Sequence, residues 1–245
     1  DIGFDFEKGR MDVSVHPFCG GSHPTDVRIT TRYKDTHFID SLYAVIHETG
    51  HALYEQGRPY AWGDVPAAES LTMGIHESQS LFWERMIAQG KPFCAHYFSA
   101  IREAFPDHLR NVTIDAFYRA LNTCKPSFIR VEADEVTYPL HIILRYEIER
   151  GLFDGTMQVD ELPQIWNELM QQYLGITPPS DVLGVLQDSH WGSGAFGYFP
   201  SYTLGAMYAC QFYKTLLRDQ PDTEDQITAG NFAPTKTWLN EKIHR

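Results

Sequence analysis

The chain has 245 residues, of which 43% are apolar and 21% are charged. This composition is that of a globular protein with its own core, and it excludes a disordered chain, a collagen-like repeat and a coiled-coil rod. The 32 acidic residues outnumber the 20 basic ones and give a net charge of −12. We therefore expect no nucleic-acid partner, because neutralising phosphates requires a basic surface.

The sequence shows no pattern typical of membrane insertion or secretion. No apolar run has the length of a membrane span, and residues 1–15 are polar and acidic, unlike a signal peptide. The cysteines Cys19, Cys94, Cys124 and Cys210 are far apart and form no C-x-x-C pair. We interpret them as free, buried thiols of a reducing compartment, with two distant disulfides as the alternative. The expected location is the cytoplasm.

Hydrophobic periodicity predicts a mainly α chain with a small sheet. Alternating β-branched residues over 26–33 predict a strand. Apolar residues at helical spacing predict helices over 36–56 and 67–89. Further helices are predicted over residues 92–105, 114–123, 134–150, 160–174, 180–188 and 201–219. The helix at 160–174 has the clearest ends, with Asp160 as its expected cap and Gly175 as its stop.

The first predicted helix carries a pattern for metal chemistry. His47-Glu48-Thr49-Gly50-His51 matches H-E-x-x-H. Residues four apart lie on one helix face, so His47 and His51 can bind the same ion. Glu48 can then reach a water on that ion and act as a general base. Gly50 costs about 1 kcal/mol relative to Ala in mid-helix, which close packing near a metal would explain. The alternative is an ordinary helix with two exposed histidines.

A catalytic zinc site usually has three protein ligands, so a third is needed. Glu55 shares the histidine face but lies about 12 Å along the axis from His47, too far to share an ion. The extended pattern H-E-x-x-H-x-x-G-x-x-H fails, because Tyr54 and Gly57 stand where Gly and His are required. The third ligand must therefore come from another element.

The next predicted helix offers three glutamates, Glu69, Glu77 and Glu84. Glu69 falls at the predicted helix start, and Glu84 lies two turns after Glu77. Glu77 sits in mid-helix between the small residues Gly74 and Ser78, and we favour it as the third ligand. The alternative is that Glu77 is a solvated helix residue.

Six short motifs follow one another along residues 16–191. They are His16-Pro17-Phe18, Asp26-Val27-Arg28-Ile29-Thr30, His47 to His51, His76-Glu77-Ser78-Gln79, Ile129-Arg130-Val131-Glu132-Ala133-Asp134 and Gly184-Val185-Leu186-Gln187-Asp188-Ser189-His190-Trp191. In this order they resemble the motifs of the carboxypeptidase Taq family of zinc metallocarboxypeptidases, also called thermostable carboxypeptidase 1.

The resemblance implies the metal ligands His47, His51 and Glu77, with Glu48 as general base and acid. It implies Zn²⁺, with Co²⁺ as the alternative metal. The implied fold is a helical gluzincin-type metallopeptidase with a small β-sheet at the active-site groove, here as one catalytic domain over residues 1–245. Family members are longer and have a helical region before the H-P-F motif. We therefore interpret this chain, which starts without methionine, as the C-terminal catalytic part.

The leading hypothesis is a metallocarboxypeptidase that removes C-terminal residues from peptides with broad specificity. The resemblance also implies a homodimer in the full-length form. Two alternatives stay open: an oligopeptidase with the same zinc chemistry, and an inactive or weakly active metal-binding fragment that lacks its N-terminal region.

Candidates for the developing oxyanion are His190 and one of Tyr198 or Tyr202, since imidazole and phenol groups donate hydrogen bonds. The alternative for these aromatic residues is ordinary packing. The glycine-rich run 192–197 is expected to let a loop close over the site. Residues 147–150 are interpreted as a solvated helix end.

An exopeptidase must also recognise a terminal carboxylate. Arg130 is the candidate, because a guanidinium donates two parallel hydrogen bonds to a carboxylate. Its alternative is an ion pair with Glu132 or Asp134. The strand at 26–33 could pair with the substrate main chain as a further strand.

Overall fold

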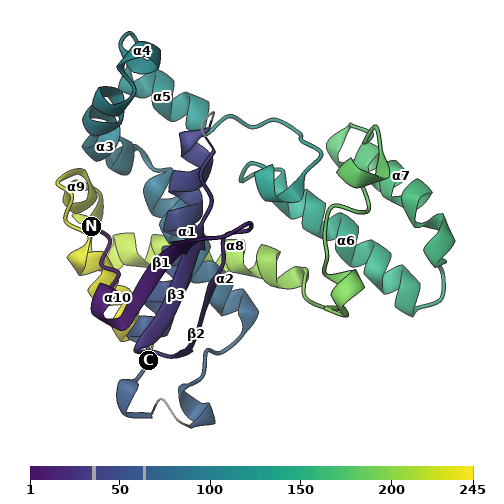
Figure 1. The fold of residues 1–245 in the computed structure, drawn as a ribbon, viewed down its shortest axis with the longest axis horizontal. Helices are drawn as coiled ribbons and strands as arrows, with labels where there is room; N and C mark the ends of the chain where they lie inside the picture. The colour runs from purple at the N-terminus through teal and green to yellow at the C-terminus, as the bar shows by residue number, and fades with distance from the viewer. Residues whose placement is uncertain (35–36, 63–64, 245) are drawn as a thin grey trace. The chain divides into compact units, whose positions relative to one another are not determined.

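The computed structural model describes residues 1–34, 37–62 and 65–244. The chain forms two compact units, the first made of Asp1–Leu121 with Gly205–Arg245 and the second of Asn122–Leu204 (Figure 1). The fold is mainly helical with one small sheet, as predicted. Within the described ranges, no helix is long and apolar enough to cross a membrane.

The helices follow the chain from end to end, and α8 begins in the second unit and continues in the first. In the first unit they are α1 Phe38–Gly57, α2 Met73–Leu81, α3 Lys91–Ala104, α4 Pro106–Leu109, α5 Ile114–Leu121, α9 Thr223–Thr228 and α10 Ala233–Lys242. The others are α6 Tyr138–Phe153, α7 Leu162–Leu174 and α8 Pro200–Asp219.

The sheet has three strands, β1 Gly9–Val13, β2 Cys19–His23 and β3 Asp26–Thr31, in the order β1-β3-β2. β3 lies in the middle, parallel to β1 and antiparallel to β2. Both of its edges are therefore already hydrogen-bonded. The prediction that the strand at 26–33 pairs with a substrate main chain is wrong for this reason, and only the outer edges of β1 and β2 remain for such pairing.

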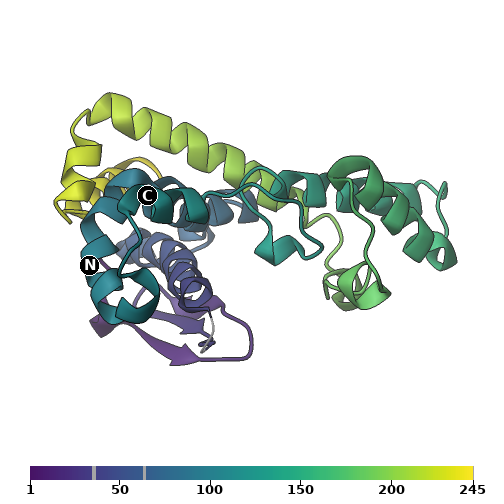
Figure 2. The ribbon, with the colours of Figure 1, turned by 90° about the horizontal axis from the view of Figure 1, so that it is seen from above.

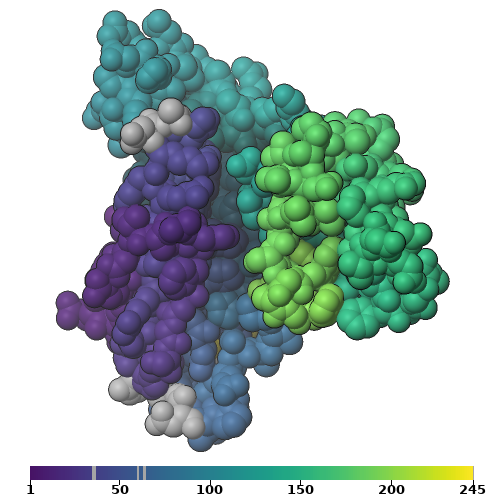
Figure 3. All heavy atoms as spheres, turned by 45° about the vertical axis from the view of Figure 1, so that its right-hand side comes forward, coloured from purple at the N-terminus to yellow at the C-terminus, as the bar shows by residue number. Residues whose placement is uncertain are grey.

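The sequence predicted β3 alone because the two outer strands lack buried apolar residues in alternation. Four of the five residues of β1 are exposed, and the purple N-terminal segment lies at the surface in Figure 3. β2 reads Cys-Gly-Gly-Ser-His. In β3, by contrast, Val27 and Ile29 are 1% and 2% exposed and pack against Ala52 of α1.

Helix α1 packs on β3 of the sheet with one side and on α2 with another (Figure 2). At Gly50, α1 approaches α2 so closely that an added Cβ would lie 2.5 Å from the carbonyl oxygen of Gln79 and 2.6 Å from the Cα of Ser80. The expectation of close packing at this glycine is confirmed, and the neighbour is the backbone of α2. Residue 36, where the predicted helix starts, lies outside the described residues.

The helix predicted at 67–89 starts later than expected. Thr72 caps α2, because its hydroxyl accepts a hydrogen bond from the amide of Ile75 at 3.2 Å. Glu69 consequently precedes the helix and is exposed. Beyond Leu81 the chain continues as a π-helical segment, Phe82–Ala88, and this segment carries Glu84.

In the second unit, α6 and α7 pack around a core that includes Leu144, Ile148, Trp166 and Met170. Helix α7 ends as predicted at Gly175, which has a φ of 69°. Asp160 is not the cap, because Gln158 and Glu161 form a capping box one turn before α7.

The prediction of a helix over residues 180–188 is wrong. The structure has only one 3-10 turn there, Asp181–Leu183, and Gly184 follows with a φ of −116° and a ψ of −121°, which are not helical angles. Helices α4, α9 and α10 and strands β1 and β2 were not predicted.

The four cysteines all lie within the described residues, and no disulfide joins them. Cys94 is buried and Cys19 is half-buried, whereas Cys124 and Cys210 are exposed. The prediction of buried thiols is therefore wrong for Cys124 and Cys210.

Candidate metal centre

Three side chains from α1 and α2 converge on one point. Nε2 of His51 lies 3.4 Å from Oε2 of Glu77, and Nε2 of His47 lies 3.9 Å from the same oxygen. One donor atom from each of the three residues lies within 4.8 Å of the others, and this is the one group of its kind in the described part of the chain. The close crossing at Gly50 brings Glu77 to the histidine face of α1.

The donor set fits a divalent cation such as zinc. Two imidazoles and one carboxylate are a known ligand set of catalytic zinc, with bonds of about 2.0–2.2 Å, which places tetrahedral ligand atoms about 3.4 Å apart. The His51–Glu77 distance already has this value. The His47–Glu77 distance, 3.9 Å, is slightly longer, and a small side-chain movement would shorten it. Glu77 is 6% exposed, so the alternative of a solvated helix residue is excluded.

The same burial argues against an ordinary helix with two exposed histidines. The side chains of His47 and His51 are 23% and 12% exposed. Helix α8 also covers Glu77, because an added Cβ at Gly205 would lie 2.8 Å from the Cβ of Glu77. Both glycines thus allow main-chain approaches that a larger residue would block.

Negative charge gathers around the two histidines. Burial alone would lower the pKa of His47, but the carboxylates of Glu77 and Glu84 outweigh it and raise that pKa to about 9. Burial dominates at His51 and lowers its pKa to about 4. Glu77 keeps a pKa below its usual value despite burial, because His47 and His51 stabilise its anion. A cation would be attracted to this acidic environment.

Glu48 follows His47 directly and is 8% exposed. Burial is the main cause that raises the pKa of its carboxyl to about 7, and the charges of Glu77 and Glu84 raise it further. A divalent cation nearby would favour the carboxylate form instead. The structure thus places a buried carboxyl group within electrostatic reach of His47 and Glu77.

The two other glutamates of the predicted helix have different places. Glu84 lies seven residues after Glu77 and contacts His47 from the other side of its ring, with Oε2 2.7 Å from Nδ1. Glu69 is exposed and outside the helix. Of the three candidates, Glu77 is therefore the one that the structure groups with both histidines.

Sequence reasoning missed a second contact, on the outer nitrogen of His51. Nδ1 of His51 lies 2.6 Å from Nδ1 of His76, and Nε2 of His76 lies 2.8 Å from Oε1 of Glu55. The sequence feature that could have indicated this contact is the position of His76, which directly precedes Glu77 on α2. The sequence excludes Glu55 as a direct metal ligand but does not predict its contact with His76.

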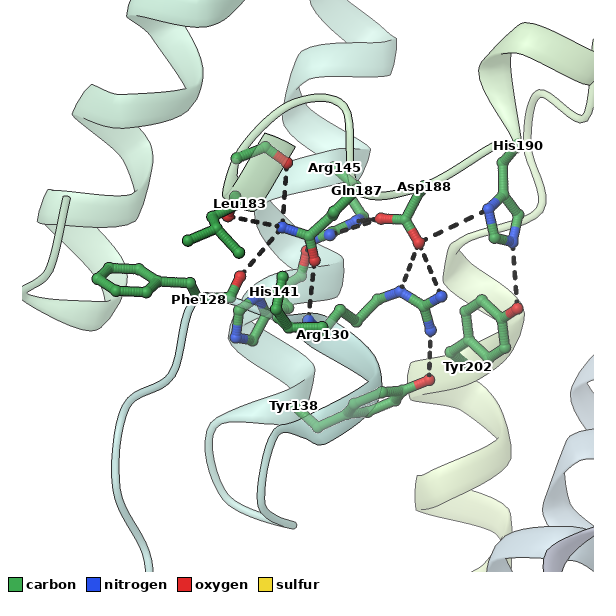
Figure 4. Close-up of polar contacts among 12 residues, drawn as sticks. Phe128, Arg130, Tyr138, His141, Arg145, Leu183, Gln187, Asp188, His190 and Tyr202 are labelled. Atoms are coloured by element: carbon green, nitrogen blue, oxygen red, sulfur yellow. Dashed lines mark hydrogen bonds and ion pairs between the residues drawn. The ribbon is translucent and has the colours of Figure 1, made fainter. Parts of the chain in front are cut away.

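Arg130, in the second unit, is 5% exposed and donates to one acidic residue (Figure 4). Its Nε and Nη2 lie 3.1 and 2.8 Å from Oδ1 of Asp188, and its Nη1 donates to the Tyr138 hydroxyl at 3.1 Å. The sequence predicted an ion pair of Arg130 with Glu132 or Asp134 as the alternative to substrate binding. The structure has an ion pair, but these two residues are not its partners. The partner is Asp188, whereas the carboxylate of Asp134 accepts backbone hydrogen bonds that include that of Thr137.

A second arginine shares that carboxylate and was also missed. Arg145 is fully buried, donates from Nε to Oδ2 of Asp188 at 2.7 Å, and lies 4.5 Å from the ring centroid of Trp166. Burial opposes ionisation of Asp188, yet Arg145 and Arg130 hold its pKa below the usual value. The sequence feature that could have indicated this role is a charged residue placed between Leu144 and Ile148, on the apolar face of α6.

The predicted substrate-facing residues of the second unit lie close together. Nε2 of His190 is 3.1 Å from the Tyr202 hydroxyl, and the His190 ring centroid is 5.5 Å from that of Tyr198. The guanidinium of Arg130 lies 4.7 Å from the ring centroid of Tyr202. Figure 4 shows Asp188 between Arg130 and His190, so one acidic residue links the two.

The acidic stretch at 147–150 is not wholly a solvated helix end. Glu149 is 9% exposed and accepts hydrogen bonds from Nε1 of Trp191, at 2.8 Å, and from the amide of Gly197. It therefore ties both ends of the glycine-rich loop to α6.

Together, the fold and the site define a helical protein whose H-E-x-x-H helix and a neighbouring helix present a two-histidine, one-glutamate metal site. The model of the family described as Carboxypeptidase Taq (M32) metallopeptidase matches residues 1–245. The chain belongs to this family.

Similar proteins agree in sequence and in structure. The chain is 50% identical over 244 residues to Carboxypeptidase 1 of Bacillus subtilis and 43% identical over 242 residues to Thermostable carboxypeptidase 1 of Thermus thermophilus. These alignments cover 100% and 99% of this chain but 49% and 47% of the relatives. The structure of a Pyrococcus furiosus carboxypeptidase matches with a TM-score of 0.96 and 42% identity, over 100% of this chain and 49% of that one. The chain thus spans about half the length of these relatives.

Proposed function

We propose that this chain carries the catalytic centre of a metal-dependent carboxypeptidase. The observation that carries the proposal is the convergence of His47, His51 and Glu77, with donor atoms within 4.8 Å of one another. Membership of the Carboxypeptidase Taq family supports the reaction type. Zn²⁺ is the proposed metal because two imidazoles and a carboxylate suit it, and Co²⁺ is the alternative.

An ion bound there would supply Lewis-acid polarisation of the scissile carbonyl and activation of water. Glu48 is the proposed general base, and its place next to His47 on the buried face of α1 supports this role. Its carboxylate would take a proton from the attacking water and return it to the departing amine. His47, His51 and Glu77 transfer no proton in this scheme and serve only as ligands.

Residues of the second unit are proposed to contact the peptide. His190, Tyr198 and Tyr202 carry donors suited to a developing oxyanion, and the short His190–Tyr202 contact supports their acting together. Arg130 is the proposed anchor for the substrate carboxylate. Its Nη1 and Nη2 each carry a second hydrogen beyond the contacts with Tyr138 and Asp188.

The remaining parts of the proposal concern the whole protein. We propose broad specificity for the residue removed, a homodimer of the full-length form, and a location in the cytoplasm. The exposed thiols of Cys124 and Cys210 support a reducing compartment.

The proposal is tested with the chain loaded with Zn²⁺ or Co²⁺ and given an N-blocked dipeptide and the amide of the same dipeptide. We expect efficient hydrolysis of the free acid and only weak hydrolysis of the amide. Glu48→Gln should retain the metal and lose about 10²–10⁴-fold in turnover, whereas Glu69→Gln, which changes an exposed glutamate, should behave as the unchanged chain. Equal cleavage of acid and amide would favour an oligopeptidase. Metal uptake without hydrolysis of either would favour an inactive fragment.

A further inference from the structure

The outer nitrogen of His51 begins a chain of polar contacts that leads away from the metal centre. Nδ1 of His51 lies 2.6 Å from Nδ1 of His76, and Nε2 of His76 lies 2.8 Å from Oε1 of Glu55. Glu55 forms an ion pair with Arg58, whose Nε donates to the carbonyl oxygen of Ala68 at 2.6 Å. The contacts are sheltered, since the side chains of His76, Glu55 and Arg58 are 12%, 21% and 13% exposed.

The chemistry of these groups fixes the direction of each hydrogen bond. An ionised carboxylate can only accept, so Nε2 of His76 must carry the hydrogen that Glu55 receives. In a neutral imidazole the other nitrogen is then an acceptor. Nδ1 of His76 therefore accepts, and Nδ1 of His51 must donate.

This direction decides which nitrogen of His51 is available. A neutral His51 that donates from Nδ1 has its lone pair on Nε2, the atom that lies 3.4 Å from Oε2 of Glu77. Without the outer contact, Glu77 would favour a hydrogen on that same Nε2, because a carboxylate attracts a donor. The contact with His76 opposes that arrangement and also holds the plane of the ring.

We propose that His76 and Glu55 form a positioning relay that presents Nε2 of His51 to the metal. The proposal rests on the proposed metal site and adds a role for two residues that do not touch the ion or the substrate. His47 is held differently, by a direct contact between its Nδ1 and the carboxylate of Glu84. The two histidines are thus held by separate contacts. A substitution of His76 or Glu55 can therefore change the contact of His51 without changing the contact of His47 with Glu84.

Two substitutions of His76 separate the relay from simple packing. Asn places an amide oxygen near the position of Nδ1 and can still accept from His51. Gln reaches toward the position of Nε2 and can contact Glu55, but has only methylene groups where His51 needs an acceptor. A cavity of about 240 Å³ borders His76, Glu55 and Arg58, so either side chain has room.

The readout is the dissociation constant for Zn²⁺, measured by competition with a chelator, together with the thermal midpoint of the metal-free chain. We expect His76→Gln to weaken binding by about 10–100-fold and His76→Asn to stay within about tenfold of the unchanged chain. Glu55→Ala should also weaken binding. Because Glu55 acts through His76, adding Glu55→Ala to His76→Gln should cause little further loss.

Equal affinity of the Gln variant and the unchanged chain would overturn the relay, as would equal losses for Gln and Asn or additive losses for Glu55→Ala and His76→Gln. A Gln variant whose metal-free midpoint falls well below that of the Asn variant would assign the effect to packing and overturn it too. These outcomes leave metal binding and hydrolysis by the unchanged chain intact. An unchanged chain that takes up no metal overturns the proposed function along with the relay.

Discussion

The imidazole of His47 contacts a different carboxylate with each of its nitrogens. Nδ1 lies 2.7 Å from Oε2 of Glu84, and Nε2 lies 3.9 Å from Oε2 of Glu77. Since Nδ1 is occupied by Glu84, Nε2 is the atom left for an ion that Glu77 also binds. The two glutamates are therefore not equivalent, although both follow His47 in the same stretch of chain.

The first prediction separates these two glutamates. Glu77→Gln removes the charge of a ligand, whereas Glu84→Gln removes only the charge of an outer hydrogen-bond partner. Changing such a partner usually costs about 10–100-fold in metal affinity. We expect the loss for Glu77→Gln to exceed that for Glu84→Gln in chelator competition with Zn²⁺. The reverse order would make Glu84 the third ligand.

The second prediction concerns the helix crossing. Gly50→Ala should gain about 1 kcal/mol in helix propensity, but the new Cβ would lie 2.5 Å from a main-chain oxygen that has little freedom to move. Overpacking of this kind costs about 1–3 kcal/mol. We expect a net loss in the free energy of unfolding, measured in urea, and weaker Zn²⁺ binding because α1 and α2 must separate.

Gly192 provides the matched control for Gly50→Ala. An added Cβ there meets nothing within 4 Å, so Gly192→Ala should leave unfolding and metal binding nearly unchanged. If Gly50→Ala is as stable as that control, the close approach of the helices does not require glycine.

Part of the site was predictable because it depends on spacing within one helix. His47 and His51 are one turn apart, so their pairing follows from helical geometry alone. The contact of His51 with His76 depends on how two helices cross, and that distance is set by Gly50 and the backbone at Gln79. The residue pattern within a single helix does not predict the distance between two helices.

The same limit explains the errors in the fold and in the second unit. β3 was predictable from buried alternation, whereas β1 gains its place only by hydrogen bonding to β3. Asp188 was part of a motif, but its pairing with Arg130 joins residues 58 positions apart. Nearby acidic residues such as Glu132 were the natural guess from local sequence.

The third prediction concerns Asp188 and acid. Its carboxylate is the acceptor for two buried arginines, and removing one partner of a buried pair typically costs about 3–5 kcal/mol. We expect Asp188→Asn to lower the free energy of unfolding by this order.

The pH dependence follows from the lowered pKa of Asp188. A carboxyl whose folded pKa lies below its unfolded value stabilises the protein above the unfolded value, and this stability is lost as pH falls through the folded pKa. The thermal midpoint of the unchanged chain should therefore fall below about pH 4, and that of Asp188→Asn should fall less. His141, whose pKa burial lowers to about 4 although Asp188 opposes this shift, destabilises the folded state as pH falls from about 6.5 to 4. The two chains are therefore compared below pH 4. Identical curves for the two chains below pH 4 would contradict the assignment.

The last prediction asks whether Arg130 binds substrate or only holds Asp188. If its guanidinium anchors the terminal carboxylate, Arg130→Ala should raise KM for a free-acid peptide. The resulting loss in kcat/KM should be about 1.5–3 kcal/mol, or about 10–150-fold, the value for a hydrogen bond to a charged group. Weak cleavage of the amidated peptide should hardly change.

Arg130→Lys makes this test sharper. Lysine keeps the positive charge near Asp188 but cannot donate two parallel hydrogen bonds, so it should preserve the thermal midpoint better than Ala while still raising KM for the free acid. A purely structural Arg130 would give the opposite pattern: the midpoint would fall in step with activity, and acid and amide would lose the same factor. In that case the second hydrogens on Nη1 and Nη2 have no role in recognition, and another donor must bind the carboxylate.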